Sequence, residues 1–174
     1  MIAVADTDIL SMFGKVKSAK LLKTLFLKIY VPIAVYEELL KTKEMGFSFI
    51  DEILKHVIVI NFDDEEHKEY LSLLKKEKYL HKGELMCIIL CKNRNCIFLT
   101  NDKQAKNYCR ENGILFFDIK GILRALFLQN ILKEEEIRRL ASEIEEKDNT
   151  SIKGFEEIFS KVEKILNLNR ENYY

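Results

Sequence analysis

The sequence predicts an α/β domain of three layers (αβα), in which helices flank a five-stranded parallel sheet and extra helices follow at the C-terminus. Short apolar runs alternate with longer helical patterns, which is typical of βαβ units. The 174 residues suit one domain of ordinary size. A hydrophobic content of 48% allows a buried core and is too high for a disordered chain.

Five short apolar runs are the expected strands. Because nearly all of their residues are apolar, we expect helices to cover both faces of the sheet. The runs occupy residues 2–5, 29–31, 57–60, 97–100 and 115–117.

Helical patterns occupy the segments between these strands. Pro32 can begin a helix without losing a hydrogen bond, and apolar residues continue that helix to residue 40. Amphipathic spacing predicts further helices over residues 63–76, 83–92 and 102–112. The last of them ends at Gly113, a residue suited to a helix C-terminus.

After the fifth strand only helical patterns remain. Three apolar stripes predict three more helices. They comprise Ile122, Leu123, Leu126 and Phe127; Ile137, Leu140, Ala141 and Ile144; and Phe155, Ile158, Phe159, Val162, Ile165 and Leu166. We divide the chain into a domain over residues 1–130 and a helical extension over 131–174, with a break at 147–151. The extension packs on the domain or contacts a partner, and its surplus of apolar residues suggests a homodimer face or a partner groove.

Charge and cysteine content exclude several classes of protein. The 28 basic residues balance 28 acidic ones, which argues against a polybasic nucleic-acid binder but allows a local basic face. No apolar run approaches the roughly 18 residues of a membrane span, so we expect a cytoplasmic protein without membrane contact. The four cysteines lack the spacing of a zinc site or a disulfide framework, and we expect buried, reduced thiols.

Acidic residues follow two of the expected strands, at the edge where open parallel sheets bind their ligands. Asp6 and Asp8 follow the first strand, and in an extended segment their carboxylates can point the same way. Asp102 follows the fourth strand, beside Asn101. Each aspartate also suits the cap of the next helix, but two acidic strand ends make capping a less complete explanation.

Two expected helices contribute further acids. Glu84 lies in a first helical turn, and the preceding Gly83 suggests close approach of another element. Of Glu37 and Glu38, one is expected to project inward, the alternative being a solvated helix face. Carboxylates without histidine or cysteine favour Mg²⁺ or Mn²⁺, which prefer oxygen ligands.

Four segments of the sequence, in the order in which they occur along the chain, resemble the motifs of the PIN-domain nucleases. The resemblance is strongest to the VapC-like toxin ribonucleases and their archaeal and bacterial relatives. The four segments are DTDIL at residues 6–10, PIAVYEEL at 32–39, KGEL at 82–85 and LTND at 99–102. The resemblance covers about residues 1–130, and the motif order carries it. It implies a PIN-like fold and hydrolysis of RNA phosphodiester bonds with Mg²⁺ or Mn²⁺ held by carboxylates.

The resemblance also implies roles for particular residues. Asp6, Glu38, Glu84 and Asp102 are the expected catalytic residues, and Asp6, Glu84 and Asp102 the direct metal ligands. Glu38, which directly precedes a leucine as in the family, is expected to orient water or join a second ion. Asp8 and Asn101 are expected to support the ligands. The chain departs from the family at Asp8, where Asn or Ser is common, and at Glu84, where many members have Asp.

Basic residues near these acids are the expected contacts for RNA. Lys103, Lys106 and Arg110 follow Asp102 at helical spacing, and Lys82 flanks Glu84, although a solvated helix face would explain them too. His81 is expected to be a loop residue near the site rather than a catalytic base.

Three functions remain open at this point. The first is an endoribonuclease, either the toxin of a pair with an antitoxin protein or an RNA-processing enzyme. The second is a module of the same fold that binds RNA or metal without cleavage. The third is a receiver-type signalling domain, which needs a phosphoacceptor aspartate after the third strand, where Asn61-Phe62-Asp63-Asp64 is a poor match.

Overall fold

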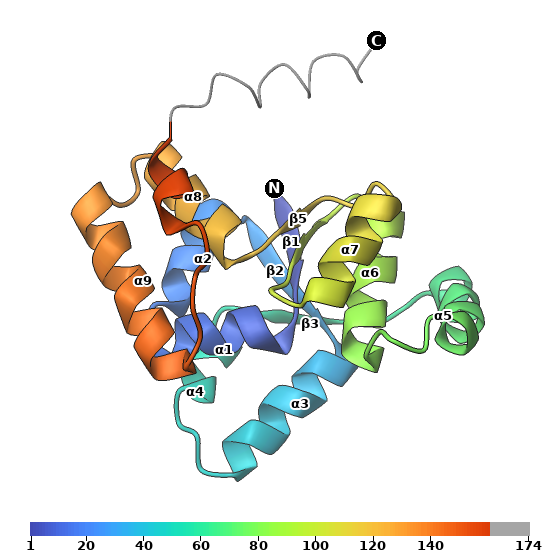
Figure 1. The fold of residues 1–174 in the computed structure, drawn as a ribbon. Coiled ribbons are helices and arrows are strands. Elements are labelled where there is room, and N and C mark those ends of the chain that lie inside the picture. Colours follow the sequence, from blue (N-terminus) through green and yellow to red (C-terminus); the bar gives the residue numbers. More distant parts are fainter. Residues whose placement is uncertain (161–174) are drawn as a thin grey trace.

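The computed structural model describes residues 1–160 and places a five-stranded sheet in the middle layer (Figure 1). Every pair of neighbouring strands is parallel, so all carboxyl ends meet at one edge of the sheet. The predicted α/β fold is therefore confirmed. In spatial order the strands are β3 (Ile58–Ile60), β2 (Lys28–Pro32), β1 (Ile2–Ala5), β4 (Ile97–Leu99) and β5 (Phe116–Phe117).

The strand order reverses direction between β1 and β4. The chain first adds β2 and β3 on one side of β1, and then returns to place β4 and β5 on the other. In this class of sheet, ligands bind beyond the carboxyl ends of the strands at the point of reversal. The residues that follow β1 and β4 therefore occupy the expected ligand site.

Burial differs between the centre and the edge of the sheet. Phe98 and Leu99 of β4 are fully buried, as expected for strands covered on both faces. The same expectation is wrong for β3, where Ile58 and Val59 are 44% and 40% exposed. β3 is an edge strand, and its apolar sequence does not reveal that it lacks a neighbour on one side.

The first predicted motif is helical rather than extended. Helix α1 begins at Thr7, directly after Asp6, so the extended segment expected across Asp8 does not exist. The sequence pattern also missed the short helices α2 and α4. The helices are α1 (Thr7–Lys15), α2 (Ala19–Leu25), α3 (Ile33–Glu44), α4 (Ile50–Leu54), α5 (Asp64–Lys76), α6 (Lys82–Arg94), α7 (Lys103–Glu111), α8 (Ile119–Leu128) and α9 (Glu134–Asp148).

The C-terminal helices bury their apolar stripes within the chain. Ile137, Leu140, Ala141 and Ile144 of α9 belong to the same core as the sheet, and Asp148 at the end of α9 pairs with Lys15 of α1 at 2.5 Å. Beyond α9, residues Phe155–Phe159 form a 3₁₀ helix (η1) rather than an α-helix, and it packs on α8. Val162, Ile165 and Leu166 of the third predicted stripe lie outside the described residues.

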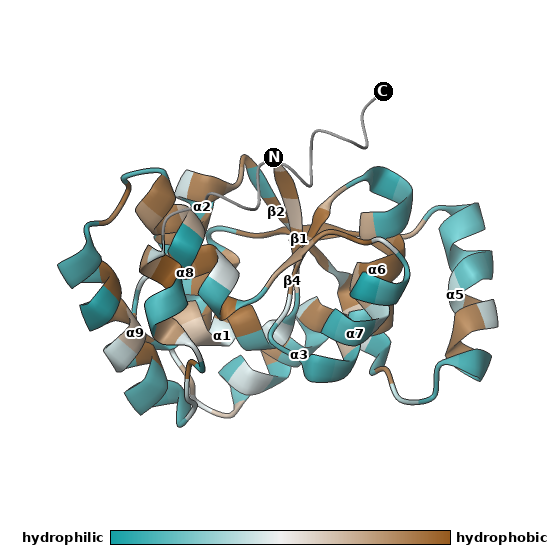
Figure 2. Ribbon diagram, turned by 45° about the horizontal axis from the view of Figure 1, so that its top comes forward, coloured by the Kyte–Doolittle hydropathy of each residue, from teal (hydrophilic) through white to brown (hydrophobic). Residues whose placement is uncertain are grey.

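Hydropathy follows this architecture. Hydrophobic residues line the layer between sheet and helices, whereas α5 stands at one end of the molecule with a largely hydrophilic surface (Figure 2). All four cysteines are buried, as predicted. None of the helices within residues 1–160 combines the length and the apolarity that a membrane span needs.

Candidate active site

The parallel pairing of β1 with β4 brings the two acidic strand ends together. Ala5 is paired with Leu99, and the next backbone amide, of Asp6, donates to the Leu99 carbonyl at 3.1 Å. Thr100 lies between the acids, because its side chain hydrogen-bonds the Asp6 carboxylate and its Oγ1 accepts from the Asp102 amide at 3.2 Å. Thr100 was not predicted from the sequence, where its only signal was its place two residues before Asp102 in the fourth motif.

Both aspartates cap the helices that follow them, each through one oxygen. Oδ1 of Asp6 accepts from the Ile9 amide at 3.1 Å, and Oδ1 of Asp102 accepts from the Ala105 amide at 2.7 Å. Capping and ligand binding are therefore compatible, since a carboxylate has a second oxygen with its own lone pairs.

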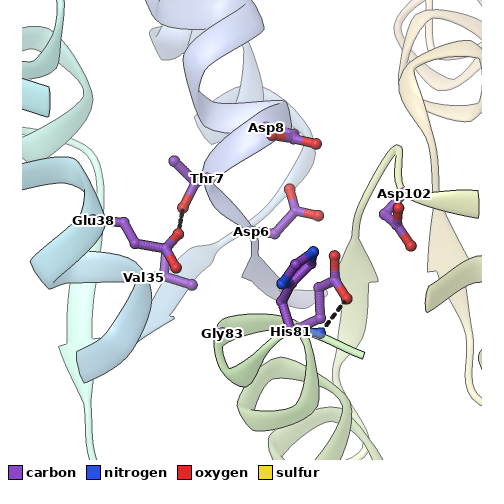
Figure 3. A pocket seen from close by; sticks show the side chains of 9 residues that line it. Asp6, Thr7, Asp8, Val35, Glu38, His81, Gly83 and Asp102 are labelled. Atoms are coloured by element: carbon purple, nitrogen blue, oxygen red, sulfur yellow. Dashed lines mark hydrogen bonds between the residues drawn. The ribbon is translucent and has the colours of Figure 1, made fainter. Parts of the chain in front are cut away.

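A pocket of about 280 Å³ lies at this edge of the sheet (Figure 3). Figure 3 shows Asp6 in the middle, with Glu38 of α3 on one side and Asp102 on the other. All four predicted catalytic acids contribute, and Asp8 joins them. The lining residues are Asp6, Thr7, Asp8, Val35, Glu38, His81, Gly83, Glu84 and Asp102. Asn101 is partly buried and is not among them.

Gly83 permits the close approach of α3 to α6 that its place in the sequence suggested. A Cβ atom at this residue would lie 3.2 Å from Cγ2 of Val35 and 3.6 Å from Oε1 of Glu38. Because the residue has no side chain, Glu38 and Glu84 can face the same pocket from two different helices.

The structure also distinguishes Glu38 from Glu37. Oε2 of Glu38 accepts a hydrogen bond of 2.5 Å from Oγ1 of Thr7, and Glu38 lines the pocket. Glu37 is exposed and does not line it, as expected for a solvated helix face. Thr7 was not predicted from the sequence, although its place between two aspartates was a signal.

Burial and mutual repulsion raise the pKa of several of these acids. Asp6 is only 5% exposed, and its burial raises the pKa to about 8 despite hydrogen bonds from Thr100 and Ile9, which lower it. Burial likewise raises the pKa of Asp8 and of Glu84, and the charge of nearby Asp102 adds to both shifts. A bound cation would relieve this repulsion.

The carboxylates are not gathered around one point. Within residues 1–160, no three side chains of the metal-binding types are placed together closely enough to hold one ion. Four of them accept hydrogen bonds from neighbours instead, as Oε2 of Glu84 does from the backbone amide of His81 at 2.9 Å. As a donor set, carboxylate oxygens fit a hard divalent cation, and the rotatable bonds of Glu38 and Glu84 allow them to turn toward it.

The predicted RNA contacts on α7 separate into two groups. Lys103 is exposed in the first turn, as is Lys82 at the start of α6. None of the four predicted contacts lines the pocket, although Lys82 and Lys103 directly neighbour lining residues in the chain. Nζ of Lys106 lies 3.2 Å from the Asp118 carboxylate, and Arg110 lies over the Phe116 ring at 5.1 Å. Arg110 is about 12 Å further along the axis of α7 than Asp102, at a rise of about 1.5 Å per residue.

The segment proposed for a receiver phosphoacceptor does not reach the pocket. Asp63 caps α5, where its Oδ1 accepts from the Glu66 amide at 2.9 Å and the Glu66 side chain accepts from the Asp63 amide. It does not line the acidic pocket.

A family model described as a PIN domain (DUF3368) matches residues 2–164 of this sequence. The chain belongs to the PIN domain family. The family predicted from the four motifs is thereby confirmed. The matched segment of this PIN domain protein extends well past residue 130, into α9 and beyond.

Two solved structures share the fold of this PIN domain. A crystal structure of VapBC2 from Rickettsia felis bound to a DNA fragment from their promoter matches with a TM-score of 0.52 and 18% identity, covering 68% of this chain and 98% of that chain. A structure of VapBC-1 from nontypeable Haemophilus influenzae matches with a TM-score of 0.50 and 16% identity, with the same coverage of both chains. At these identities the similarity shows a common fold. No curated protein matches the sequence.

Proposed function

We propose that this PIN domain is a metal-dependent endoribonuclease that hydrolyses phosphodiester bonds of RNA. The observation that carries the proposal is the pocket at the point of strand reversal, where carboxylates from four separate elements face one another. Such a surplus of negative charge is costly without a cation, as the raised pKa of Asp6 indicates.

Asp6, Glu84 and Asp102 would hold Mg²⁺ or Mn²⁺, since they project from three elements around the centre of the pocket. Such an ion polarises a phosphoryl oxygen and lowers the pKa of bound water. Asp8 and Asn101 would support the ligands from positions beside Asp6 and Asp102.

Glu38 would orient the attacking water. The Thr7 hydroxyl donates to its Oε2 at 2.5 Å, which holds the carboxylate in one orientation and leaves Oε1 able to accept a proton or a hydrogen bond from water. Thr7, at the start of α1, is thus the positioning residue for Glu38 of α3.

The test is cleavage of labelled RNA with Mg²⁺ or Mn²⁺, compared with a chelator. Asp6→Asn and Glu84→Gln should each abolish cleavage, whereas Asp64→Asn, at an exposed position of α5, should not. Cleavage that survives both site substitutions would refute the carboxylate site. Metal-independent RNA binding without any cleavage would instead favour the alternative, a binding module of the same fold.

A toxin role is the second candidate within this proposal. It is supported by the fold shared with two VapBC structures and by the four motifs. Expression of the protein in the cytoplasm should then arrest growth, and a small protein encoded beside it should relieve the arrest as its antitoxin. An RNA-processing enzyme would cause no arrest that such a partner relieves.

We further propose that residues 131–174 act as a helical extension of the nuclease domain over residues 1–130. The apolar stripes of α8 and α9 that suggested a homodimer are buried within the chain. Light scattering on the purified protein tests the dimer directly, and a monomer at all concentrations would remove it.

A further inference from the structure

The proposed nuclease needs basic side chains near its acidic pocket to bind RNA phosphates. Two of the predicted ones already contact other residues, since Lys106 pairs with Asp118 and Arg110 lies over the Phe116 ring. A different basic segment joins α5 to α6. Residues 75–82, the 75–82 segment, read KKEKYLHK and contain four lysines, a tyrosine and a single acid. Only its last residue, Lys82, belongs to the predicted RNA contacts.

Two ion pairs place the 75–82 segment at the pocket edge of the sheet. Glu66, in the first turn of α5, pairs with Arg94 at the end of α6 at 2.6 Å, and Glu69 pairs with Lys92 at the same distance. The two helices are therefore antiparallel, and the end of α5 lies beside the start of α6. Because His81 and Gly83 line the pocket, the C-terminal end of the 75–82 segment reaches it. Figure 1 shows the connection from α5 to α6 that this segment forms.

The lysines of this segment are available to a ligand. Lys75, Lys76, Lys78 and Lys82 are all exposed, and none of them forms an ion pair with another residue of the described chain. Other lysines nearby are paired, as Lys92 is with Glu69. The segment thus presents four uncompensated positive charges beside a pocket of carboxylates.

An aromatic ring lies among these charges. Tyr79 is 47% exposed and lies two residues from Glu77, the only acid of the segment. Leu80 is 6% exposed and anchors the segment in the core, while its amide donates to the Glu77 carbonyl at 3.2 Å. The ring is therefore held on a short, anchored connection, which lowers the entropy cost of binding.

We propose that the 75–82 segment binds single-stranded RNA that enters the acidic pocket, with Lys75, Lys76, Lys78 and Lys82 contacting phosphates and Tyr79 stacking on a base. Exposed cations interleaved with an aromatic ring are typical of surfaces that bind single strands. A duplex keeps its bases stacked on one another, so Tyr79 favours a single strand. The inference rests on the proposed function, because it takes the acidic pocket to be the site at which the bound RNA is cleaved.

The test measures binding in the presence of a chelator, so that cleavage does not interfere. Fluorescence anisotropy of a labelled single-stranded oligouridine compares the wild-type protein with K75Q/K76Q/K78Q. The matched control is K17Q/K20Q/K28Q, which removes the same charge from exposed lysines that do not line the acidic pocket. Melting temperatures verify that all variants fold.

We expect K75Q/K76Q/K78Q to bind oligouridine more weakly than the wild-type protein. The slope of log K against the logarithm of the salt concentration should be shallower by about 2, because each lost phosphate contact accounts for about 0.7. Tyr79→Ser should weaken binding about fivefold or more, and Tyr79→Phe should restore it, since stacking needs only the ring. Equal losses in the control variant, or equal affinity for duplex RNA, would overturn the inference.

The two proposals fail in different ways. If metal-dependent cleavage occurs but K75Q/K76Q/K78Q binds oligouridine like the wild-type protein, the 75–82 segment is not the RNA surface and the nuclease proposal stands. If no cleavage occurs but the variant loses binding as described, the surface is supported and the nuclease proposal fails.

Discussion

Asp6→Asn should make the protein more stable at neutral and alkaline pH although it removes a residue of the proposed active site. Asp6 is buried, and its pKa of about 8 lies far above the ordinary value of 3.8. Asparagine retains an oxygen that can cap α1 by accepting from the Ile9 amide, as Oδ1 of Asp6 does at 3.1 Å. The substitution therefore removes the titration and preserves the local structure.

The sign follows from the protons bound by each state. Below the ordinary pKa of 3.8, both the folded and the unfolded protein hold a proton on Asp6. Between that value and about 8, the folded state holds one proton more, so the free energy of unfolding falls as the pH rises. Above about 8 both states are ionised and no further stability is lost to this group.

The size of the effect is large for a single residue. From about pH 5 to pH 8, one proton corresponds to about 4 kcal/mol, at about 1.4 kcal/mol per pH unit. For a chain of this length that is roughly 10 °C in melting temperature. The raised pKa values of Asp8 and Glu84 act in the same direction, so the variant should keep a smaller slope of the same sign.

Urea unfolding in a chelator, followed by circular dichroism, measures the effect across this pH range. The difference in stability between Asp6→Asn and the wild-type protein should be small near pH 4 and should widen by about 4 kcal/mol between pH 5 and pH 8, with the variant the more stable. Asp64→Asn, at an exposed position, is the matched control and should follow the wild-type curve. The reasoning would be refuted if Asp6→Asn and the wild-type protein lost stability in parallel over the whole range.

Three further predictions concern the same pocket. Mn²⁺ should raise the melting temperature more near pH 8 than near pH 5, because protons compete with the ion for the carboxylates; equal stabilisation at both would contradict this. Thr7→Val should lower kcat about tenfold while RNA affinity in chelator is retained, and Thr7→Ser should restore it, since only the hydroxyl bonded to Glu38 matters. Gly83→Ala should lower the free energy of unfolding in urea by about 1–2 kcal/mol, because the new Cβ would lie 3.2 Å from Cγ2 of Val35. Gly121→Ala is the control and should be neutral or stabilising, because its Cβ would lie 3.5 Å from the nearest atom.

Much of the fold was predictable because it depends on local patterns. Short apolar runs located all five strands within a residue or two, including the exposed edge strand β3. The missed helices α2 and α4 are only seven and five residues long. Helices this short are held by burial, as Leu22 and Ile53 are in the core, rather than by their own propensity.

The candidate site divides in the same way. Acids that follow strands in a parallel sheet must meet at one edge, so the approach of Asp6 and Asp102 followed from the order of elements. Hydrogen bonds between distant segments could not be predicted from the sequence. An example is the bond between Thr7 and Glu38, which lie 31 residues apart. Helical spacing placed Lys106 and Arg110 on one face of α7 and could not reveal which residues they meet.

By itself, the sequence determined the α/β fold, the family and the acids that belong together, because strand burial, helix capping and motif order are properties of neighbours along the chain. Only the tertiary structure decided which side chains are free. Lys106 is paired with Asp118, whereas Lys75 and Lys76 are exposed and form no ion pair within the described residues. Charge becomes available for a ligand only where folding brings no opposite charge to it, and that depends on contacts between segments far apart in the chain.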